Sequence, residues 1–125
     1  MKLTYCVPEN KKIRVIIDSD TACEVDDPFA IAHALMSPKL IVRAVIAEHF
    51  AAAGSMQKSY EAIKRLTAAM ELDVNVLSGE EWPLKQTKRI SEGVKFIIEE
   101  ARSQNSHPLY ILCLGALSNI ARALE

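Results

Sequence analysis

The stretch that decides the fold is Ile16-Ile17-Asp18-Ser19-Asp20-Thr21-Ala22-Cys23-Glu24-Val25-Asp26-Asp27-Pro28. It joins an apolar run to five carboxylates within ten positions. Like charges this close repel one another, and a buried charge without a partner costs roughly 3–5 kcal/mol. Carboxylate oxygens are also the ligands that hard divalent cations such as Ca²⁺ prefer. The stretch therefore predicts a strand that ends in a cation-binding loop.

Short apolar runs and longer amphipathic segments alternate along the rest of the chain. Four runs match the usual strand length of about five to six residues, at 13–18, 40–47, 74–77 and 109–114. Apolar residues spaced three and four apart predict helices at 28–36, 56–70 and 92–103. This order predicts an α/β fold, a three-layer α/β/α sandwich with a mostly parallel, Rossmann-like sheet whose strands are buried on both faces.

Three side chains are placed to cap the predicted helices at their N-termini. Asp27 precedes a proline at the first helical position, and Ser55 and Ser91 precede the other two helices. Residues 78–90 form the longest irregular segment, and the chain has no internal repeat or linker. We therefore expect a single α/β domain over residues 1–125.

The composition excludes several classes of partner. The chain has 125 residues, 50% of them hydrophobic and 25% charged, and a net charge of −1. This charge balance predicts no binding to nucleic acid or to an anionic membrane. No apolar run is long enough for a signal peptide or a membrane span, so we expect a cytoplasmic protein. Three widely separated cysteines predict buried free thiols.

The acidic stretch lies where ligands bind in a parallel α/β sheet, outside the carboxyl ends of the strands. Asp18 closes the first predicted strand, and Asp26 and Asp27 lie where the loop enters a helix. Taken singly, each of these residues is also typical of a turn or a helix cap. As a set they favour a metal site. Turn formation does not need five acids, and a cation would compensate the repulsion between their carboxylates.

Two known acidic loops fit this stretch poorly. An EF-hand loop that starts at Asp18 would need glycine at the position of Cys23 and glutamate at the position of Phe29. Asp18-Ser19-Asp20 also resembles the start of haloacid-dehalogenase-like phosphatases, in which the first Asp is a nucleophile and the second a general acid. That pattern wants Thr or Val at Ala22 and does not account for Asp26 and Asp27, so it remains an alternative.

Two motifs resemble those of the nucleoside hydrolase family. The first is a strand that runs into Asp18-Ser19-Asp20, then a turn, then Asp26-Asp27 and a helix. The second is Leu112-Cys113-Leu114-Gly115-Ala116-Leu117-Ser118-Asn119-Ile120-Ala121, which is similar to the family's strand followed by Gly-(Pro/Gly/Ala)-Leu-Thr-Asn-(Ile/Val)-Ala. The resemblance covers essentially the whole chain and implies Ca²⁺-dependent hydrolysis of the N-glycosidic bond of ribonucleosides.

The resemblance also implies roles for individual residues. Asp20 would bind Ca²⁺ and take the proton from its bound water, and Asp27 would chelate the ion with both oxygens. Asp26 would hold a ribose hydroxyl. The main-chain carbonyl of Leu114 would be another calcium ligand. Asp18 would not bind the ion but would hold these ligands in position. A cation held in this way would orient the sugar diol while carboxylates stabilise an oxocarbenium-like transition state.

The sequence departs from the family pattern in three ways. The turn before Asp26 is two residues longer than usual, and Glu48-His49 occupies the stretch where the family has Gly-Asn with a substrate-contacting Asn. Glu48 and His49 are candidates for substrate contact or proton transfer, with a solvated loop pair as the alternative. The chain is also much shorter than nucleoside hydrolases. It is therefore expected to be the N-terminal segment of a longer domain with the same fold, truncated, and to be inactive alone.

Two further expectations follow from this resemblance. A sheet cut short exposes an apolar edge, and the family itself assembles, so we expect a homo-oligomer. A non-catalytic metal- or sugar-binding relative is the alternative function, because the loop and the Asn are altered. The sequence does not indicate which nucleobase is preferred.

Overall fold

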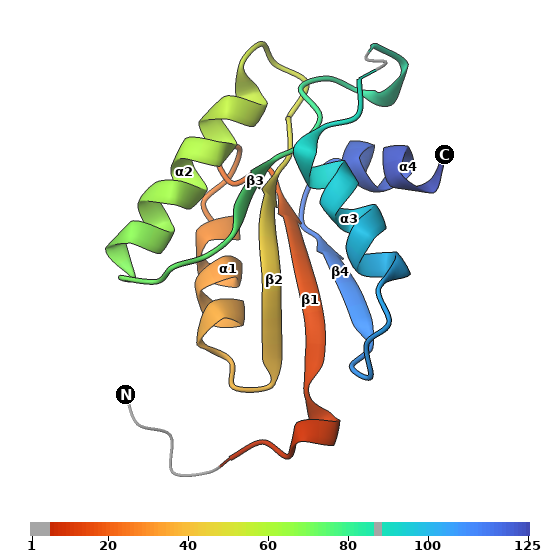
Figure 1. Cartoon of the computed structure of the whole chain (residues 1–125). Helices are drawn as coiled ribbons and strands as arrows, with labels where there is room; N and C mark the ends of the chain where they lie inside the picture. The colour runs from red at the N-terminus through yellow and green to blue at the C-terminus, as the bar shows by residue number, and fades with distance from the viewer. Residues whose placement is uncertain (1–5, 87–88) are drawn as a thin grey trace.

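The structure is a computed structural model that describes residues 6–86 and 89–125 (Figure 1). Within these residues, four parallel strands form one sheet in the order β3-β2-β1-β4. The strands are β1 (Ile13–Ser19), β2 (Leu40–Ala47), β3 (Val76–Ser78) and β4 (Leu109–Cys113). The helices are α1 (Asp27–Met36), α2 (Ser55–Ala69), α3 (Glu92–Arg102) and α4 (Ser118–Leu124), with 3-10 turns η1 (Glu9–Lys11) and η2 (Leu84–Gln86).

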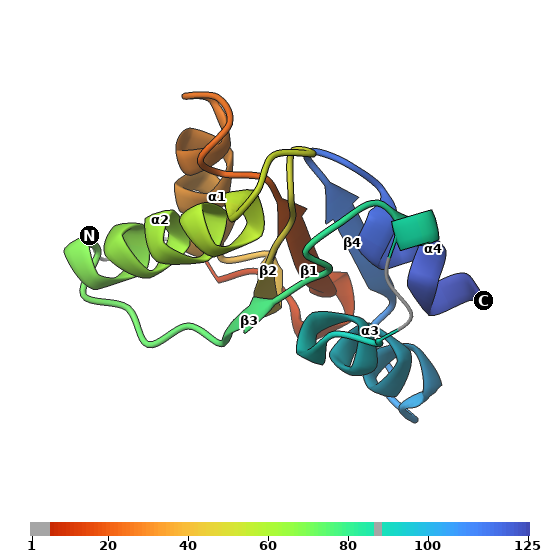
Figure 2. The same ribbon diagram turned by 90° about the horizontal axis from the view of Figure 1, so that it is seen from above.

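The helices cover the two faces of the sheet, which confirms the predicted three-layer sandwich. Figure 2 shows α1 and α2 on one side of the strands and α3 and α4 on the other. On the first side, Ile31 of α1 and Ile63 of α2 pack with Val45 in one buried cluster. On the second side, Ile97 of α3 packs with Ile16 and Ile46 in another. Burial of both faces of β1 and β2 is the hydrophobic basis of this architecture.

The prediction that all strands are buried on both faces is wrong for β4. Strand β1 lies between β2 and β4, whereas β4 pairs with β1 alone among the described strands. Tyr110 of β4 is 53% exposed and Cys113 is also exposed. The outer side of α1 is apolar as well, with Phe29 77% and Met36 63% exposed. An alternating or continuous apolar run does not distinguish a central strand from an edge strand, because strands of both kinds bury at least one face.

Two of the three predicted N-terminal caps are wrong, because the side chains concerned make other contacts. Asp27 and Ser55 are the first residues of α1 and α2, not the capping residues before them. Asp27 instead accepts a hydrogen bond from Ser19, and Ser55 Oγ accepts one from the Phe50 amide. Only the third cap is confirmed, since Ser91 accepts a hydrogen bond from the Val94 amide across 3.3 Å.

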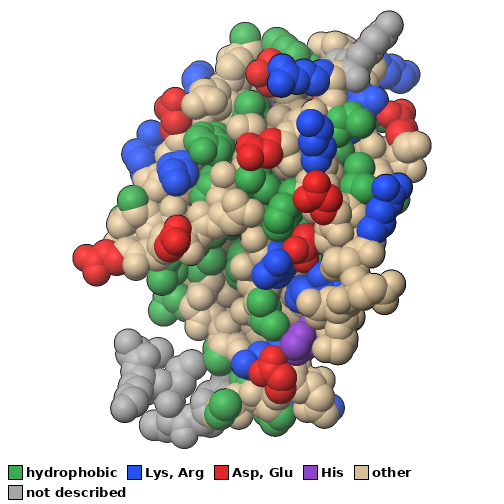
Figure 3. All heavy atoms as spheres, in the orientation of Figure 1, with side chains coloured by type: hydrophobic (Ala, Val, Ile, Leu, Met, Phe, Trp, Pro, Cys, Tyr) green, Lys and Arg blue, Asp and Glu red, His purple; other side chains and the backbone are tan. Residues whose placement is uncertain are grey.

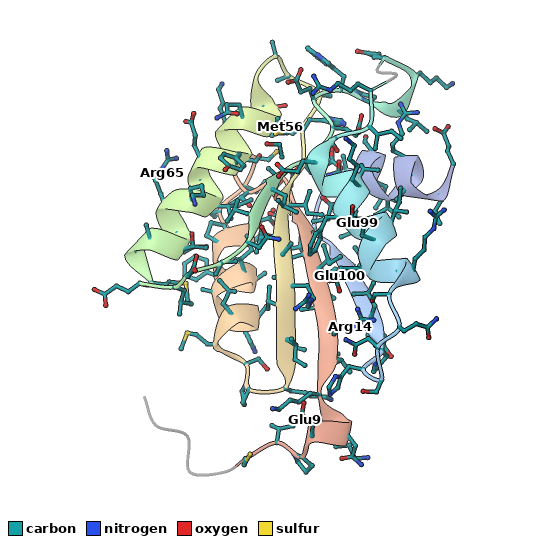
Figure 4. All side chains as sticks on the ribbon, viewed as in Figure 1. Glu9, Arg14, Met56, Arg65, Glu99 and Glu100 are labelled. Atoms are coloured by element: carbon teal, nitrogen blue, oxygen red, sulfur yellow. The ribbon has the colours of Figure 1, made fainter. Side chains whose placement is uncertain are left out.

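A buried ion cluster fastens α3 to the sheet at the amino-terminal side of the strands. Glu100 of α3 accepts hydrogen bonds from Arg14 of β1 and from Arg43 of β2, each at 2.8 Å. The side chains of Arg14 and Glu100 are 7% and 10% exposed, and Figure 4 shows them close together between β1 and α3. The two guanidinium groups hold the pKa of the Glu100 carboxyl below its ordinary value. This cluster is therefore a structural anchor, away from the carboxyl ends of the strands.

The surface agrees with the charge balance but corrects the expectation for the cysteines. Acidic and basic side chains are interspersed on the face drawn in Figure 3. Cys6, Cys23 and Cys113 are free but exposed, because they lie before β1, in the acidic loop and at the end of the edge strand. None of the described helices is both long and apolar enough to cross a bilayer.

Candidate functional site

The carboxyl ends of the strands bring together the segments that the two sequence motifs contribute. The amide of Leu114, after β4, donates to the carbonyl of Asp18 at 2.8 Å. The amide of Glu48, after β2, donates to the carbonyl of Ser19 at 2.8 Å. These bonds continue the parallel ladders beyond the strands, so that the loops after β1, β2 and β4 start side by side at one edge of the sheet.

Asp20 and Asp27 form the acidic pair of this edge. Asp27 is buried, and its Oδ2 accepts a hydrogen bond from Ser19 Oγ at 2.6 Å. Burial and the neighbouring Asp27 carboxylate raise the pKa of Asp20. Asp26, by contrast, is exposed on the outer side of the loop. A cation would stabilise the Asp20 carboxylate, whose ionisation the neighbouring carboxylate opposes.

Gly115 allows the backbone after β4 to approach this pair. A Cβ atom at Gly115 would lie 2.5 Å from both Cγ and Oδ1 of Asp20, closer than such atoms approach. Only glycine therefore lets the chain pass so near to the Asp20 carboxylate. The main chain around Leu114 and Gly115 thus lies beside the carboxylate that the resemblance assigns to the metal.

Asp18 lies behind the acidic pair and is fully buried. Its Oδ1 accepts a hydrogen bond from Asn119 Nδ2 at 2.8 Å, while its Oδ2 has no partner among the described residues. Burial raises the pKa of Asp18 to about 7, against the opposing effect of the Asn119 hydrogen bond. A buried carboxylate oxygen without a partner is costly to ionise, which is the physical reason for this raised pKa.

Asn119 of α4 holds three strand ends together. Besides its bond to Asp18, its backbone amide donates to Glu48 Oε2 at 3.0 Å. Its Oδ1 accepts from the amide of Glu80, after β3, at 2.7 Å. The sequence motif contains Asn119 but assigns it no role, and Glu80 lies in the segment predicted to be irregular. Neither role was readable from the sequence, because the partners lie far apart along the chain.

Glu48 and His49 are buried, which excludes the solvated loop pair as an interpretation. Glu48 accepts hydrogen bonds from the amides of His49 and Asn119, each at 3.0 Å. Desolvation nevertheless raises the pKa of Glu48 to about 8, and the nearby Asp18 adds to this effect. The His49 ring contacts Ser118 Oγ through Nε2 at 2.7 Å. Both side chains therefore belong to the interior of the site.

The donors at this edge fit a calcium ion in part. Among residues 6–86 and 89–125, no three His, Cys, Asp or Glu side chains are arranged as a ready metal site. The Asp20 and Asp27 carboxylates and the main chain beside Gly115 supply oxygen donors of the kind that Ca²⁺ takes, which is fewer than its usual six to eight ligands. The residues present are therefore compatible with part of a calcium site.

A cavity of about 610 Å³ lies next to this edge. Residues 78–82, Gln86 and residues 89–91 line it together with the first turns of α2 and α3, and Met56, Glu80, Trp82 and Lys95 are among the lining residues. Figure 4 shows Met56 at the start of α2, on the side toward which the strands run. The volume of the cavity is in the range of small-molecule binding sites, about 300–1,000 Å³. Glu80 links the cavity to the Asn119 cluster.

Comparison with known proteins identifies the family. The model of the inosine-uridine preferring nucleoside hydrolase family matches residues 15–125. The chain belongs to this family. This nucleoside hydrolase match confirms the family predicted from the two motifs and favours it over a haloacid-dehalogenase-like phosphatase.

One solved structure supports the fold of this nucleoside hydrolase chain. It is a nucleoside hydrolase-related hypothetical protein from Saccharophagus degradans that is associated with carbohydrate metabolism. The two are 18% identical with a TM-score of 0.63, and the match covers 90% of this chain and 33% of the other. The chain thus spans about one third of the length of that structure. No curated protein matches the chain.

Proposed function

We propose that this chain carries the metal- and ribose-binding part of a Ca²⁺-dependent hydrolase that cleaves the N-glycosidic bond of ribonucleosides. The observation that carries the proposal is the position of Asp20 and Asp27. Their carboxylates are neighbours at the carboxyl edge, and the Gly115 backbone lies against one of them. Hard oxygen donors gathered from two loops are what a calcium site requires.

Each residue of the edge has a role in this proposal. Asp20, Asp27 and the Leu114 carbonyl would hold Ca²⁺, which would polarise water and orient the sugar diol. Asp20 would also accept the proton of the attacking water, a role that its raised pKa favours. The exposed Asp26 is free to meet a ribose hydroxyl, and buried Asp18 supports the loop through its carbonyl and Asn119.

The whole protein's assembly and location belong to the same proposal. The open edge of β4, with exposed Tyr110 and Leu114, supports a homo-oligomer or another covering of this side of the sheet. We also propose that the protein is cytoplasmic. The bond cleavage itself is proposed for the whole protein, because the chain spans one third of the related structure.

A second candidate function is a metal- or sugar-binding relative without turnover. It is favoured by the buried Glu48-His49 pair, which stands where the family pattern has a substrate-contacting Asn. In that case the acidic pair would bind its ligand, but no nucleoside would be cleaved. Assay of a longer protein that contains this segment, with inosine and uridine as substrates, separates the two functions. Turnover that is lost in Asp20→Asn supports the hydrolase.

Calorimetric titration of the chain with Ca²⁺, after treatment with a chelator, tests the metal site. We expect binding with a Kd in the range of about 10⁻⁶–10⁻³ M, as for sites with few ligands. Asp27→Asn should weaken it by about tenfold or more, because one charged donor is lost. Asp73→Asn is the matched control, since Asp73 is exposed in the loop before β3, at the opposite edge of the sheet. Equal affinity in the wild-type chain and Asp27→Asn would contradict the proposed site.

A further inference from the structure

The hydrogen bonds of the His49 ring define its tautomer. The backbone amide of Ala51 donates to Nδ1 at 3.0 Å, so Nδ1 must be an acceptor and carries no proton. A neutral imidazole has one N–H, which is then on Nε2. Nε2 lies 2.7 Å from Ser118 Oγ and 3.3 Å from Glu48 Oε1. His49 is therefore the donor, and the Ser118 hydroxyl oxygen is the acceptor.

The same contacts keep His49 from exchanging protons. Protonation of Nδ1 would set its N–H against the N–H of Ala51 and remove a hydrogen bond. Burial also lowers the pKa of His49, against the attraction of Glu80. The ring is 3% exposed. His49 is thus held as a neutral, oriented donor, which argues against the proton-transfer role considered from the sequence.

This arrangement fixes the direction of the Ser118 hydroxyl. Because the Ser118 oxygen accepts from His49, its own O–H must point elsewhere, and no other partner for it lies within residues 6–86 and 89–125. Ser118 is partly exposed and is the first residue of α4, three positions after Gly115, whose backbone lies against Asp20. It therefore presents one directed donor at the carboxyl edge. The serine is not activated as a nucleophile, because the imidazole donates to it and does not accept from it.

The charges around Ser118 indicate which kind of ligand atom accepts a hydrogen bond from its hydroxyl. Asp20 lies at this edge beside Asp27, and a phosphate or carboxylate ligand would meet the repulsion of these two carboxylates. We propose that Ser118 binds an uncharged oxygen of the nucleoside, and that His49 is the positioning residue that orients its hydroxyl. This inference rests on the proposed function and gives the Glu48-His49 stretch a role in place of the family's Asn.

The tautomer is tested first, without any ligand. Nitrogen-15 NMR of the imidazole rings in the full chain at neutral pH should show His49 as the Nε2–H tautomer. Ser118→Ala should move the His49 Nε2 signal, whereas Ser106→Ala, an exposed serine in the loop before β4, should not. An Nδ1–H tautomer or a charged ring would overturn the inference, even if the protein binds nucleosides.

Ligand binding is tested with uridine, titrated calorimetrically in the presence of Ca²⁺. Loss of one hydrogen bond to a neutral acceptor predicts about five- to tenfold weaker binding in Ser118→Ala. Ser118→Thr, which keeps the hydroxyl, should stay within about twofold of the wild-type chain, and so should Ser106→Ala. Equal affinity in Ser118→Ala and wild type would overturn the inference alone. Absence of binding to the wild-type chain would contradict the proposed function and, with it, the ligand assigned to Ser118.

Discussion

The buried carboxyl of Glu48 makes the stability of the chain depend on pH. Its pKa is raised from 4.5 to about 8, so the folded state holds this proton more tightly than the unfolded state. The stabilisation is complete below pH 4.5 and is lost as the pH rises through about 8. At 1.36 kcal/mol per pKa unit, the loss has a ceiling of about 5 kcal/mol. Glu48→Gln cannot ionise, so this part of the pH dependence should vanish in the variant.

The sign of the difference between variant and wild type should reverse with pH. Near pH 5 we expect Glu48→Gln to be less stable by about 1 kcal/mol, because its amide NH₂ must face the backbone N–H of either His49 or Asn119. Near pH 9 the wild-type carboxylate is charged and buried, so the variant should be the more stable protein.

Urea unfolding followed by circular dichroism at several pH values between about 5 and 9 measures this difference, since urea, unlike guanidinium, does not screen charges. Glu99→Gln is the matched control, because Glu99 is exposed on α3 (Figure 4). Its difference from wild type should stay constant over this range. If the Glu48→Gln curve runs parallel to the wild-type curve, the reasoning about the buried carboxyl is refuted.

Two further predictions concern the anchor and the metal loop. Glu100→Gln should lower the free energy of unfolding by about 3 kcal/mol in urea titrations near pH 7, because Arg14 loses its buried partner. Since the pKa of Glu100 is lowered in the folded state, this difference should shrink as the pH falls below about 4, and a constant difference would contradict it. Gly115→Ala should weaken Ca²⁺ binding by about tenfold or more, because its Cβ would push the Asp20 carboxylate aside by about 1 Å. Gly54→Ala, where no atom lies within 4 Å of the added Cβ but the φ of +69° disfavours alanine, should lower stability and leave the calorimetric affinity unchanged.

The order and type of the elements were predictable from local pattern. The β-branched runs at 13–18 and 40–47 correspond to strands β1 and β2, and the helical spacing at 92–103 corresponds to α3. Exposure of β4 was not predictable, because the apolar run is the same whether or not a further strand covers its edge. The start of α1 was misplaced by one residue, since Ser19, a residue of another element, takes the Asp27 carboxylate as its acceptor.

The candidate site was predictable where a motif is contiguous, and not where it depends on long-range contacts. The crowding of acids within one loop predicted a metal site, and the family resemblance singled out Asp20 and Asp27 among them. The burial of Glu48, and the cluster that joins it to Asn119 and Glu80, depend on three strand ends meeting. No sequence pattern specifies those contacts, because the spacing between the partners is set by the crossover connections.

The bonds that close this edge join residues made at very different times during synthesis. The Asn119–Asp18 hydrogen bond spans 101 residues, and the Asn119–Glu48 bond spans 71. The ribosome releases the acidic loop first, and long-range pairing is slow because a large loop must close before its contacts form. A nascent chain that has not yet released β4 therefore holds Asp18 without its amide partner. The order of translation thus makes assembly of the carboxyl edge a late event in folding, whatever the speed at which β1 and β2 pair.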